Sequence, residues 1–340
     1  MTTNKFFSML LLLALVFTFT NCRNDDNDDP TPPPPSEKPP LNMVRIEGGT
    51  FHFGAGLQDG VYPDNEGGTA AGVATTVSTF FLSATPITQA QYHYVMRVNP
   101  SRFQVSNNVN YAHPHASARP IEGITWYHAI AFANKLSLME NREPVYHVEG
   151  ISNADWRNIT HADVPTIVDI ITNVAWLNVA KNLNANGFRL PTEAEWEFAA
   201  RGGIQSESAQ GRGRDFFFSN GNNGNNVWHW QNHNTVARTH PVAHFAPNAL
   251  GLYDMSGNVW EWTWNRSDPP PPPPAVLPAI PPAGAGGTNP VGPETGSYRV
   301  VRGGSFGNNA VLTRVSYRRP YPPAARGTVI GFRLASNSVQ

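Results

Sequence analysis

From about residue 203 to its end, the chain is rich in glycine, asparagine and aromatic residues and shows only short strand patterns. Residues that favour turns place much of such a chain in loops rather than in long regular elements. The sequence shows no alternation of strands and helices, and no glycine-rich phosphate loop follows a strand. It therefore predicts an α+β fold with little regular secondary structure and argues against a doubly wound nucleotide-binding fold.

The clearest helix signals lie in three short segments. Thr88 can cap a helix over "QAQYHYVMR", and apolar residues recur at helical spacing between Thr125 and Met139. The clearest signal is "LPTEAEWEFAARGG", in which Thr192 and Glu195 form a capping box and a Gly-Gly pair ends the helix.

Strand patterns flank these helices. Residues 43–54, "MVRIEGGTFHFG", predict a hairpin around a Gly-Gly turn, and "TTVSTFFLSATPIT" predicts a further strand that ends at Pro86. The chain closes with the predicted strands "YRVVRGG" and "GFRLAS". Residues 140–187 are expected to form a partly helical insertion. The proline-rich stretch 267–287 is expected to be an exposed loop, because successive prolines cannot enter a sheet.

The N-terminus has the features of a targeting signal. Lys5 precedes an apolar core from Phe6 to Thr20, which is shorter than the roughly 20 residues that span a bilayer. Cys22, the only cysteine of the chain, follows directly. Residues 1–21 are therefore predicted to be a bacterial lipoprotein signal peptide, with a lipid on Cys22 that anchors the mature protein to a membrane. A cleaved secretory signal with an incidental cysteine is the alternative.

Residues 22–42 contain an acidic cluster followed by proline runs, a composition that cannot form a core. They are predicted to be a solvated, semi-extended tether. An acidic cluster after a lipidated cysteine resembles the surface-export signal of Bacteroidetes lipoproteins. This resemblance implies a lipid-anchored protein of the outer membrane, exposed on the cell surface, and a plain periplasmic spacer is the alternative.

Charge and histidine pattern argue against several function classes. The formal net charge is -1, so the chain lacks the basic face that neutralises phosphates, and no nucleic-acid partner is expected. No histidine pair lies on a credible helix, and no second cysteine could complete a zinc site. No nucleophile-elbow phrase supports a serine hydrolase.

Eight phrases follow one another in order: "IEGGTFHFG", "PITQAQYHYVM", "NPSRF", "RPIEGITWYHAIAFANKLS", "GFRLPTEAEWEFAARGG", "PNALGLYDMSGNVWEW", "RVVRGGSF" and "IGFRLA". Each is a weak signal alone, but together they resemble the formylglycine-generating-enzyme family, also called the sulfatase-modifying factor family. The resemblance implies one domain over residues 43–336 with a variant of the C-type lectin fold. That fold has little regular secondary structure, in agreement with the composition.

The phrase "YDMSGNVWEW" suggests a cation site. Asp254 and Glu261 are carboxylates joined by a turn that Gly257 permits, and calcium takes oxygen ligands of this kind. The family builds a calcium site from this segment. The resemblance implies side-chain oxygens from Asp254 and Glu261, and backbone carbonyls from Gly257 and Val259. Hydrogen bonds from backbone amides to the two carboxylates are the alternative.

Tryptophans gather near this phrase. Trp260 and Trp262 are expected in the core, because large aromatic side chains fill space where strands are few. Trp230 and Trp264 are open between a core position and a platform for sugar stacking.

The family's reaction oxidises a substrate cysteine and uses two active-site cysteines that bind copper through their thiolates. In this chain the corresponding positions after "RGGSF" are Asn308 and Thr313, and neither an amide nor a hydroxyl replaces a thiolate. Ser305 matches the family's active-site serine but does not perform this oxidation alone. Copper binding and formylglycine generation are therefore not expected.

The segment that contains "RGGSF" and "IGFR" also resembles the variable proteins of diversity-generating retroelements, a branch that uses this scaffold for binding. Its spacing of alanine, arginines and proline follows theirs. Mutagenesis in such systems acts on adenines of AAC codons and cannot yield Lys, Gln, Glu, Met or Trp. Residues 307–329 contain none of these five residue types. They are therefore predicted to be a variable binding surface for a protein or a glycan.

The candidate ligand-binding residues of this surface are Gly307, Asn308, Asn309, Val311, Leu312, Thr313, Val315, Ser316, Tyr317, Arg319, Tyr321, Gly327, Thr328 and Val329. Tyrosine and arginine among them are residue types that anchor interfaces. Arg314 and Arg318 either join this surface or pair with buried carboxylates. A non-enzymatic scaffold lipoprotein of a secretion or gliding apparatus is the second hypothesis, and an oxidase of the formylglycine-generating type is the third.

Overall fold

The computed structural model describes residues 37–54, 72–104, 116–165, 173–206, 218–219, 227–229, 237–269 and 286–338. The predicted signal peptide, Cys22, the tether up to residue 36, Trp230 and most of the proline-rich stretch lie outside these residues. Within the described part, no helix is long and apolar enough to cross a membrane.

Each of the three predicted helices begins after a threonine cap. Thr88, Thr125 and Thr192 each form a capping box, in which the threonine oxygen accepts a hydrogen bond from a backbone N–H three residues later. The helices that follow are α1 (Gln89–Met96), α2 (Trp126–Met139) and α6 (Glu193–Ala200). All three predicted helices are confirmed.

The predicted insertion is partly helical, as expected. Its elements are α3 (Asn153–Asn158), η2 (His161–Asp163), α5 (Val174–Leu177) and the paired strands β5 (Tyr146–His147) and β6 (Ala180–Lys181). Trp176 of α5 packs edge-on against Trp156 of α3 and Tyr127 of α2, with ring centroids 5.6 and 5.9 Å away. These aromatic contacts attach the insertion to α2.

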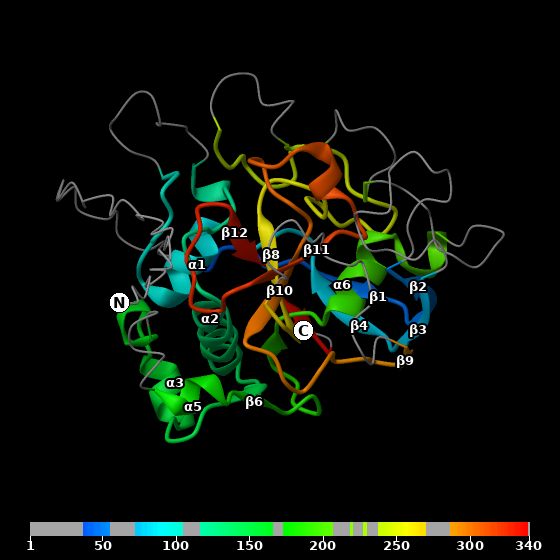
Figure 1. Cartoon of the computed structure of the whole chain (residues 1–340). Helices are drawn as coiled ribbons and strands as arrows, with labels where there is room; N and C mark the ends of the chain where they lie inside the picture. Colours follow the sequence, from blue (N-terminus) through cyan, green and yellow to red (C-terminus); the bar gives the residue numbers. More distant parts are fainter. Residues whose placement is uncertain are drawn as a thin grey trace, which may run out of the picture. The chain divides into compact units, whose positions relative to one another are not determined.

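The remaining strands form three sheets in the described part of the chain (Figure 1). The first has the order β1 (Met43–Ile46), β4 (Phe80–Ser83), β13 (Ala335–Ser336), β7 (Phe188–Arg189). The second has the order β11 (Arg318–Tyr321), β10 (Tyr298–Arg302), β8 (Trp260–Ser267), β12 (Ile330–Phe332). The third has the order β2 (Gly49–Phe53), β3 (Val73–Val77), β9 (Gly287–Thr288).

The predicted hairpin over residues 43–54 is wrong. Its two arms do not pair with each other: β1 pairs with β4, and β2 pairs with β3. The register is continuous across the break, with Ile46 opposite Phe80 and Gly49 opposite Val77. Residues 43–53 and 73–83 therefore form one long antiparallel ladder that divides between two sheets. The Gly-Gly pair is a crossing point and not a turn, because a Cβ on Gly48 would lie 2.6 Å from the carbonyl oxygen of Val77.

Strand β8 lies at the centre of the second sheet and is buried on both faces. Trp260, Trp262 and Trp264 are 2%, 0% and 8% exposed and belong to the hydrophobic core around α2. This confirms the core positions of Trp260 and Trp262 and assigns Trp264 to the core as well. On the opposite face, Glu261 accepts a hydrogen bond from the indole N–H of Trp196 in α6 at 2.7 Å. β8 thus connects the two cores that α2 and α6 organise.

The turn that leads into β8 requires glycine at position 257. Gly257 has φ +85°, and a Cβ there would lie 2.3 Å from the carbonyl oxygen of Trp228. Gly251 has a similar φ of +80°, but a Cβ on it would meet nothing within 4 Å. An alanine at position 251 would therefore introduce backbone strain alone, whereas an alanine at position 257 would add a steric clash to the same strain.

We expect Gly251→Ala to cost about 1–2 kcal/mol of unfolding free energy, which is the penalty of a left-handed alanine. Gly257→Ala should cost at least about 3 kcal/mol, because a clash with backbone adds to the same penalty. Urea denaturation of the two variants measures the difference. Equal losses would contradict the close approach at Gly257.

Candidate binding surface and metal site

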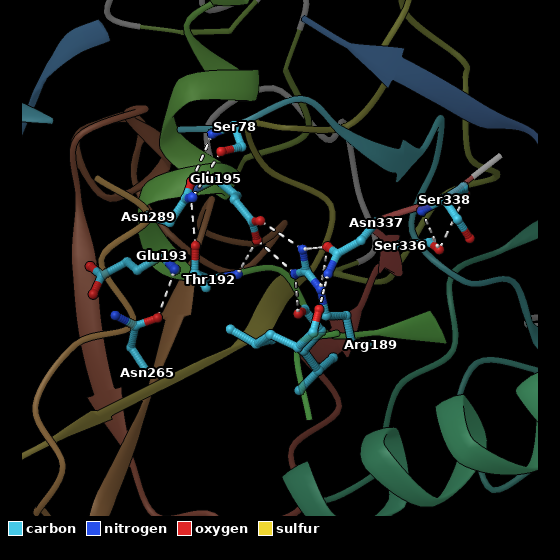
Figure 2. Close-up of polar contacts among 12 residues, drawn as sticks. Ser78, Arg189, Thr192, Glu193, Glu195, Asn265, Asn289, Ser336, Asn337 and Ser338 are labelled. Atoms are coloured by element: carbon cyan, nitrogen blue, oxygen red, sulfur yellow. Dashed lines mark hydrogen bonds and ion pairs between the residues drawn. The ribbon is translucent and has the colours of Figure 1, made fainter. Parts of the chain in front are cut away.

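Helix α6 carries three buried glutamates, and each pairs with arginine. Glu195 forms a bidentate pair with Arg189, with both N–O distances at 2.7 Å. Figure 2 shows the Arg189 guanidinium between Glu195 and Asn337. Burial raises the pKa of Glu195, but Arg189 and the capping bonds of Thr192 outweigh burial, so that this pKa is lowered. The pair fastens β7 and the C-terminal strand to α6.

The buried guanidinium of Arg302, on β10, links α6 to the segment that follows. It pairs with Glu193 at 3.3 Å and with Glu197. It also donates hydrogen bonds to the carbonyl oxygens of Val315, at 2.8 Å, and Ser316, at 3.1 Å. Because Arg302 bonds carbonyl oxygens here, these two contacts do not depend on the side chains at positions 315 and 316.

Arg318, on β11, forms a second pair with Glu193. Its Nε and Nη2 lie 2.6 and 3.0 Å from the two carboxylate oxygens. Burial raises the pKa of Glu193, but Arg318 and Arg302 outweigh burial and lower it. Of the two alternatives for Arg318, the structure supports pairing with a buried carboxylate.

The rest of the 307–329 segment is also held by its main chain. At its start, the N–H of Phe306 donates to the carbonyl oxygen of Asn258 at 3.0 Å. Toward its end, carbonyl oxygens of the segment accept hydrogen bonds from backbone N–H groups of the surrounding frame. These bonds join Pro323 to Trp126 at 2.9 Å, Gly327 to Gly123 at 3.1 Å and Val329 to Trp260 at 2.7 Å.

The structure divides the predicted ligand-binding residues by exposure. Gly307, Asn309 and Arg319 are exposed, and eight others are partly exposed: Asn308, Leu312, Ser316, Tyr317, Tyr321, Gly327, Thr328 and Val329. The side chain of Val311 lies outside the described part of the chain.

Thr313 and Val315 require a correction, because they are 0% and 2% exposed. Val315 packs in the core around α6, and the Thr313 hydroxyl donates to the carbonyl oxygen of Ala310 at 2.8 Å. Thr313 ends the 3-10 helix η5 (Ala310–Thr313), and the chain from there to Val315 is buried, so these two side chains support the surface rather than form it.

The two positions that would carry the family's cysteines have structural roles here. The side-chain oxygen of Asn308 accepts hydrogen bonds from the N–H of Ser305, at 3.0 Å, and from its hydroxyl, at 2.7 Å. Asn308 thus closes the turn after Ser305, while Thr313 is packed inside. Asn308 and Ser305 thus stabilise the turn, and Thr313 fills part of the interior.

Two tyrosines and an arginine give the surface residues suited to binding. Tyr317 lies 5.9 Å from the Trp260 ring, and Tyr321 lies 5.9 Å from the Trp262 ring. The guanidinium of the exposed Arg319 lies 5.5 Å from the Tyr321 ring centroid. Packing on the buried indoles orients each tyrosine, and partly exposed aromatic rings beside arginine are common at the centre of interfaces.

Glu261, a predicted calcium ligand, has other partners in this structure. Its two carboxylate oxygens lie 2.6 and 2.8 Å from Nε and Nη2 of the fully buried Arg333, and the indole of Trp196 donates to one of them. Arg333 also donates to the carbonyl oxygens of Ser83 and Tyr253 at 3.0 and 2.8 Å. A calcium ion would have to share this carboxylate with a guanidinium that is already bound to it.

The carboxylate of Asp254 is better suited to a cation than that of Glu261. It has φ +54°, and its Oδ2 accepts a hydrogen bond from the N–H of Ala243 at 2.8 Å. Burial raises the pKa of Asp254 to about 6, although the Ala243 bond and Arg333 oppose this rise. It lines a small pocket together with Ser219, Phe245 and Ser256.

Among the described residues, no three His, Cys, Asp or Glu side chains form a group suited to a metal. The four predicted ligands thus fit calcium only in part. The Asp254 carboxylate lines a small pocket, whereas the charge of the Glu261 carboxylate is already balanced by Arg333. Calcium at Asp254, Gly257, Val259 and Glu261 stays a prediction.

The comparisons with known proteins place the chain. The family described as "Sulfatase-modifying factor enzyme 1-like domain" matches residues 29–338. The chain belongs to this family. The predicted α+β fold of the formylglycine-generating-enzyme type is thereby confirmed.

The proteins that the chain resembles in sequence include one named as a chaperone and one named as an enzyme. "Chaperone protein LppX" of Paenibacillus barcinonensis is 30% identical over 309 residues, which is 86% of this chain and 88% of that protein. The formylglycine-generating enzyme of Thermomonospora curvata is 37% identical over 164 residues, 46% of this chain and 49% of that enzyme.

Among solved structures, the Treponema denticola variable protein 1 is 31% identical, with a TM-score of 0.68 over 88% of this chain and 95% of that one. The resemblance to a variable protein of this family is confirmed.

Sequence reasoning gave pairing with a buried carboxylate as an alternative for Arg318, but it did not find the same role for Arg302 and Arg333. A usable signal was present: "EAEWE" places three carboxylates in one short helix whose apolar residues predict burial. Buried carboxylates require cationic partners. The arginines of "RVVRGG" and "GFRLAS" were therefore candidates for ion pairs with α6 and β8.

We expect Arg302→Gln to lower the free energy of unfolding by about 3–5 kcal/mol, because it leaves Glu193 and Glu197 buried with fewer cationic partners. Arg319→Gln, in the same region but exposed, should change it by less than about 0.5 kcal/mol. Denaturant unfolding checks both variants. A loss at Arg302 no larger than that at Arg319 would refute the role of Arg302 in the frame.

The calcium prediction has a direct test. A chelator should lower the melting temperature of the protein, and Asp254→Asn should abolish the difference between calcium and chelator. Asp268→Asn, an exposed carboxylate near the end of β8, is the matched control and should keep the full response. An unchanged melting temperature in the unmodified chain would remove the calcium site.

Proposed function

We propose that this chain is a non-catalytic lipoprotein that binds a protein or glycan ligand through the surface formed by residues 307–329. The observation that carries the proposal is how this segment is held. Frame groups bond its main-chain carbonyls at residues 315, 316, 323, 327 and 329, while Asn309 and Arg319 are exposed, and the Asn309 side chain accepts a hydrogen bond from the N–H of Leu312 within the segment. Exposed side chains can then change without loss of the contacts that fix the backbone.

The sequence supports a binding role over a catalytic one. Positions 308 and 313 carry an amide and a hydroxyl where the family's oxidase uses thiolates. The likeness to a variable protein over most of both chains agrees with the same role. Retroelement diversification of residues 307–329 is part of the proposal, on the basis of their composition.

A second candidate is a chaperone-type role toward one partner protein. The similarity to "Chaperone protein LppX", which extends over most of both proteins, favours it. Both candidates require a binding surface. A diversified binding protein would vary its exposed contact residues, whereas a chaperone with one partner would keep its contact residues constant.

Comparison of this gene across isolates distinguishes the two. We expect amino-acid differences to concentrate at Asn309, Ser316 and Arg319 and at other outward positions of 307–329. Thr313 and Val315, which point inward in the same segment, should stay unchanged and serve as the internal control. Outward positions that stay as constant as Thr313 and Val315 would contradict diversification and favour the chaperone role.

The proposed location is the outer face of the outer membrane, through a lipid on Cys22. Cys22→Ala should release the protein from the membrane fraction, since a protein without its acyl chains loses the buried methylenes that hold it. Immunoblots of membrane and soluble fractions measure this, and Cys22→Ser provides a second variant. Retention of both variants in the membrane would rule out the lipid anchor.

A further inference from the structure

Three cations gather where β8 and β10 meet the insertion. The amine of Lys181 lies 4.2 Å from the ring centroid of Trp264, and the guanidinium of Arg299 lies 4.7 Å from the same ring. Arg299 also lies 3.7 Å from the ring of Trp126. Arg266 faces Arg299 across the ladder between β8 and β10. The cluster therefore joins residues from three strands, including β6.

None of the three cations forms an ion pair within the described part of the chain. Arg299 donates to the carbonyl oxygen of Trp264 at 2.5 Å, and Arg266 donates to those of Gly296 and Leu177 at 3.0 and 3.1 Å. The other buried arginines discussed above, such as Arg302, meet a carboxylate. Arg299 is only 3% exposed, and a buried cation without an anion is costly unless something else compensates.

The mutual repulsion of these cations is visible in their pKa values. Burial first, and then Arg299 and Arg189, lower the pKa of Lys181 to about 7, while Glu195 opposes this shift by more than Arg266 adds to it. Burial and Arg266 lower the pKa of Arg299 to about 9. Aromatic rings compensate part of the charge of Arg299 by cation–π contact. The cluster still carries positive charge that no described carboxylate neutralises.

The cluster is open to solvent on one side. Lys181 and Arg266 are partly exposed, their neighbour Ala180 is exposed, and Leu177 is 40% exposed. An anion that arrives from solvent would reach the amine of Lys181 and the guanidinium of Arg266 first. Guanidinium and ammonium groups together are suited to oxyanions, since they donate several charge-assisted hydrogen bonds.

We propose that Lys181, Arg266 and Arg299 form a binding site for a tetrahedral oxyanion, a sulfate or phosphate group, beside the indole of Trp264. The site is separate from the exposed side chains of 307–329 and does not depend on the proposed ligand-binding role. The bound group would neutralise the cluster and hold Lys181 protonated. Sulfate and phosphate share this chemistry, and their relative affinity identifies the group that the site prefers.

The test measures acetylation of lysines in the full chain at pH 7 by peptide mass spectrometry. Sodium sulfate and sodium phosphate are compared with sodium chloride at equal ionic strength. An anion that raises the pKa of Lys181 by one unit lowers its neutral fraction at pH 7, and so its acetylation rate, by about fivefold. The exposed Lys38 is the control and should react at the same rate in all three salts.

Two variants complete the experiment. Arg266→Gln, which keeps Lys181 in place, should lose most of the protection by sulfate and phosphate. Arg45→Gln removes an exposed arginine on β1 and should retain it. Equal Lys181 acetylation in all three salts would overturn the proposal and leave cation–π contact as the whole account of Arg299. Protection that persists unchanged in Arg266→Gln would also overturn it.

Discussion

The ion pairs between α6 and the arginines of β10 and β11 are the constraint on which the rest of the structure depends. Arg302 and Arg318 both reach Glu193, and Arg302 also reaches Glu197. Buried pairs add little net stability over apolar packing, because desolvation offsets Coulomb attraction. They do fix position, since a guanidinium that meets carboxylates and carbonyls at once has one orientation. The backbone around residues 315–318 is therefore set by α6.

The same device recurs elsewhere in the fold. Arg333 joins β8 to the carbonyls of Ser83 and Tyr253, and Arg189 joins β7 to α6. Loops that carry few regular hydrogen bonds acquire defined positions in this way, which suits a family with little helix and strand. Arg299 departs from the pattern because aromatic rings replace the carboxylate, and that departure motivates the proposed oxyanion site.

Local signals predicted the local features of this fold. Cap residues located the helices after Thr88 and Thr192, and the helical spacing of apolar residues located the helix after Thr125, since these signals are decided within a short stretch. Side-chain size placed Trp260 and Trp262 inside. Features that depend on distant partners were missed or wrong: the break of the ladder near Gly48, the inward side chains of 307–329, and the pairs of Arg302 and Arg333. Composition and spacing do not record which distant groups meet.

The central claim is that the outward side chains of 307–329 can change while the frame keeps the backbone in place. One variant with Asn309→Ser, Ser316→Asn, Arg319→Ser and Thr328→Ser tests it by denaturant unfolding. The account predicts a change in unfolding free energy of less than about 2 kcal/mol, the sum of four surface substitutions. A loss of more than about 4 kcal/mol, as expected for changes in a packed core, would contradict it.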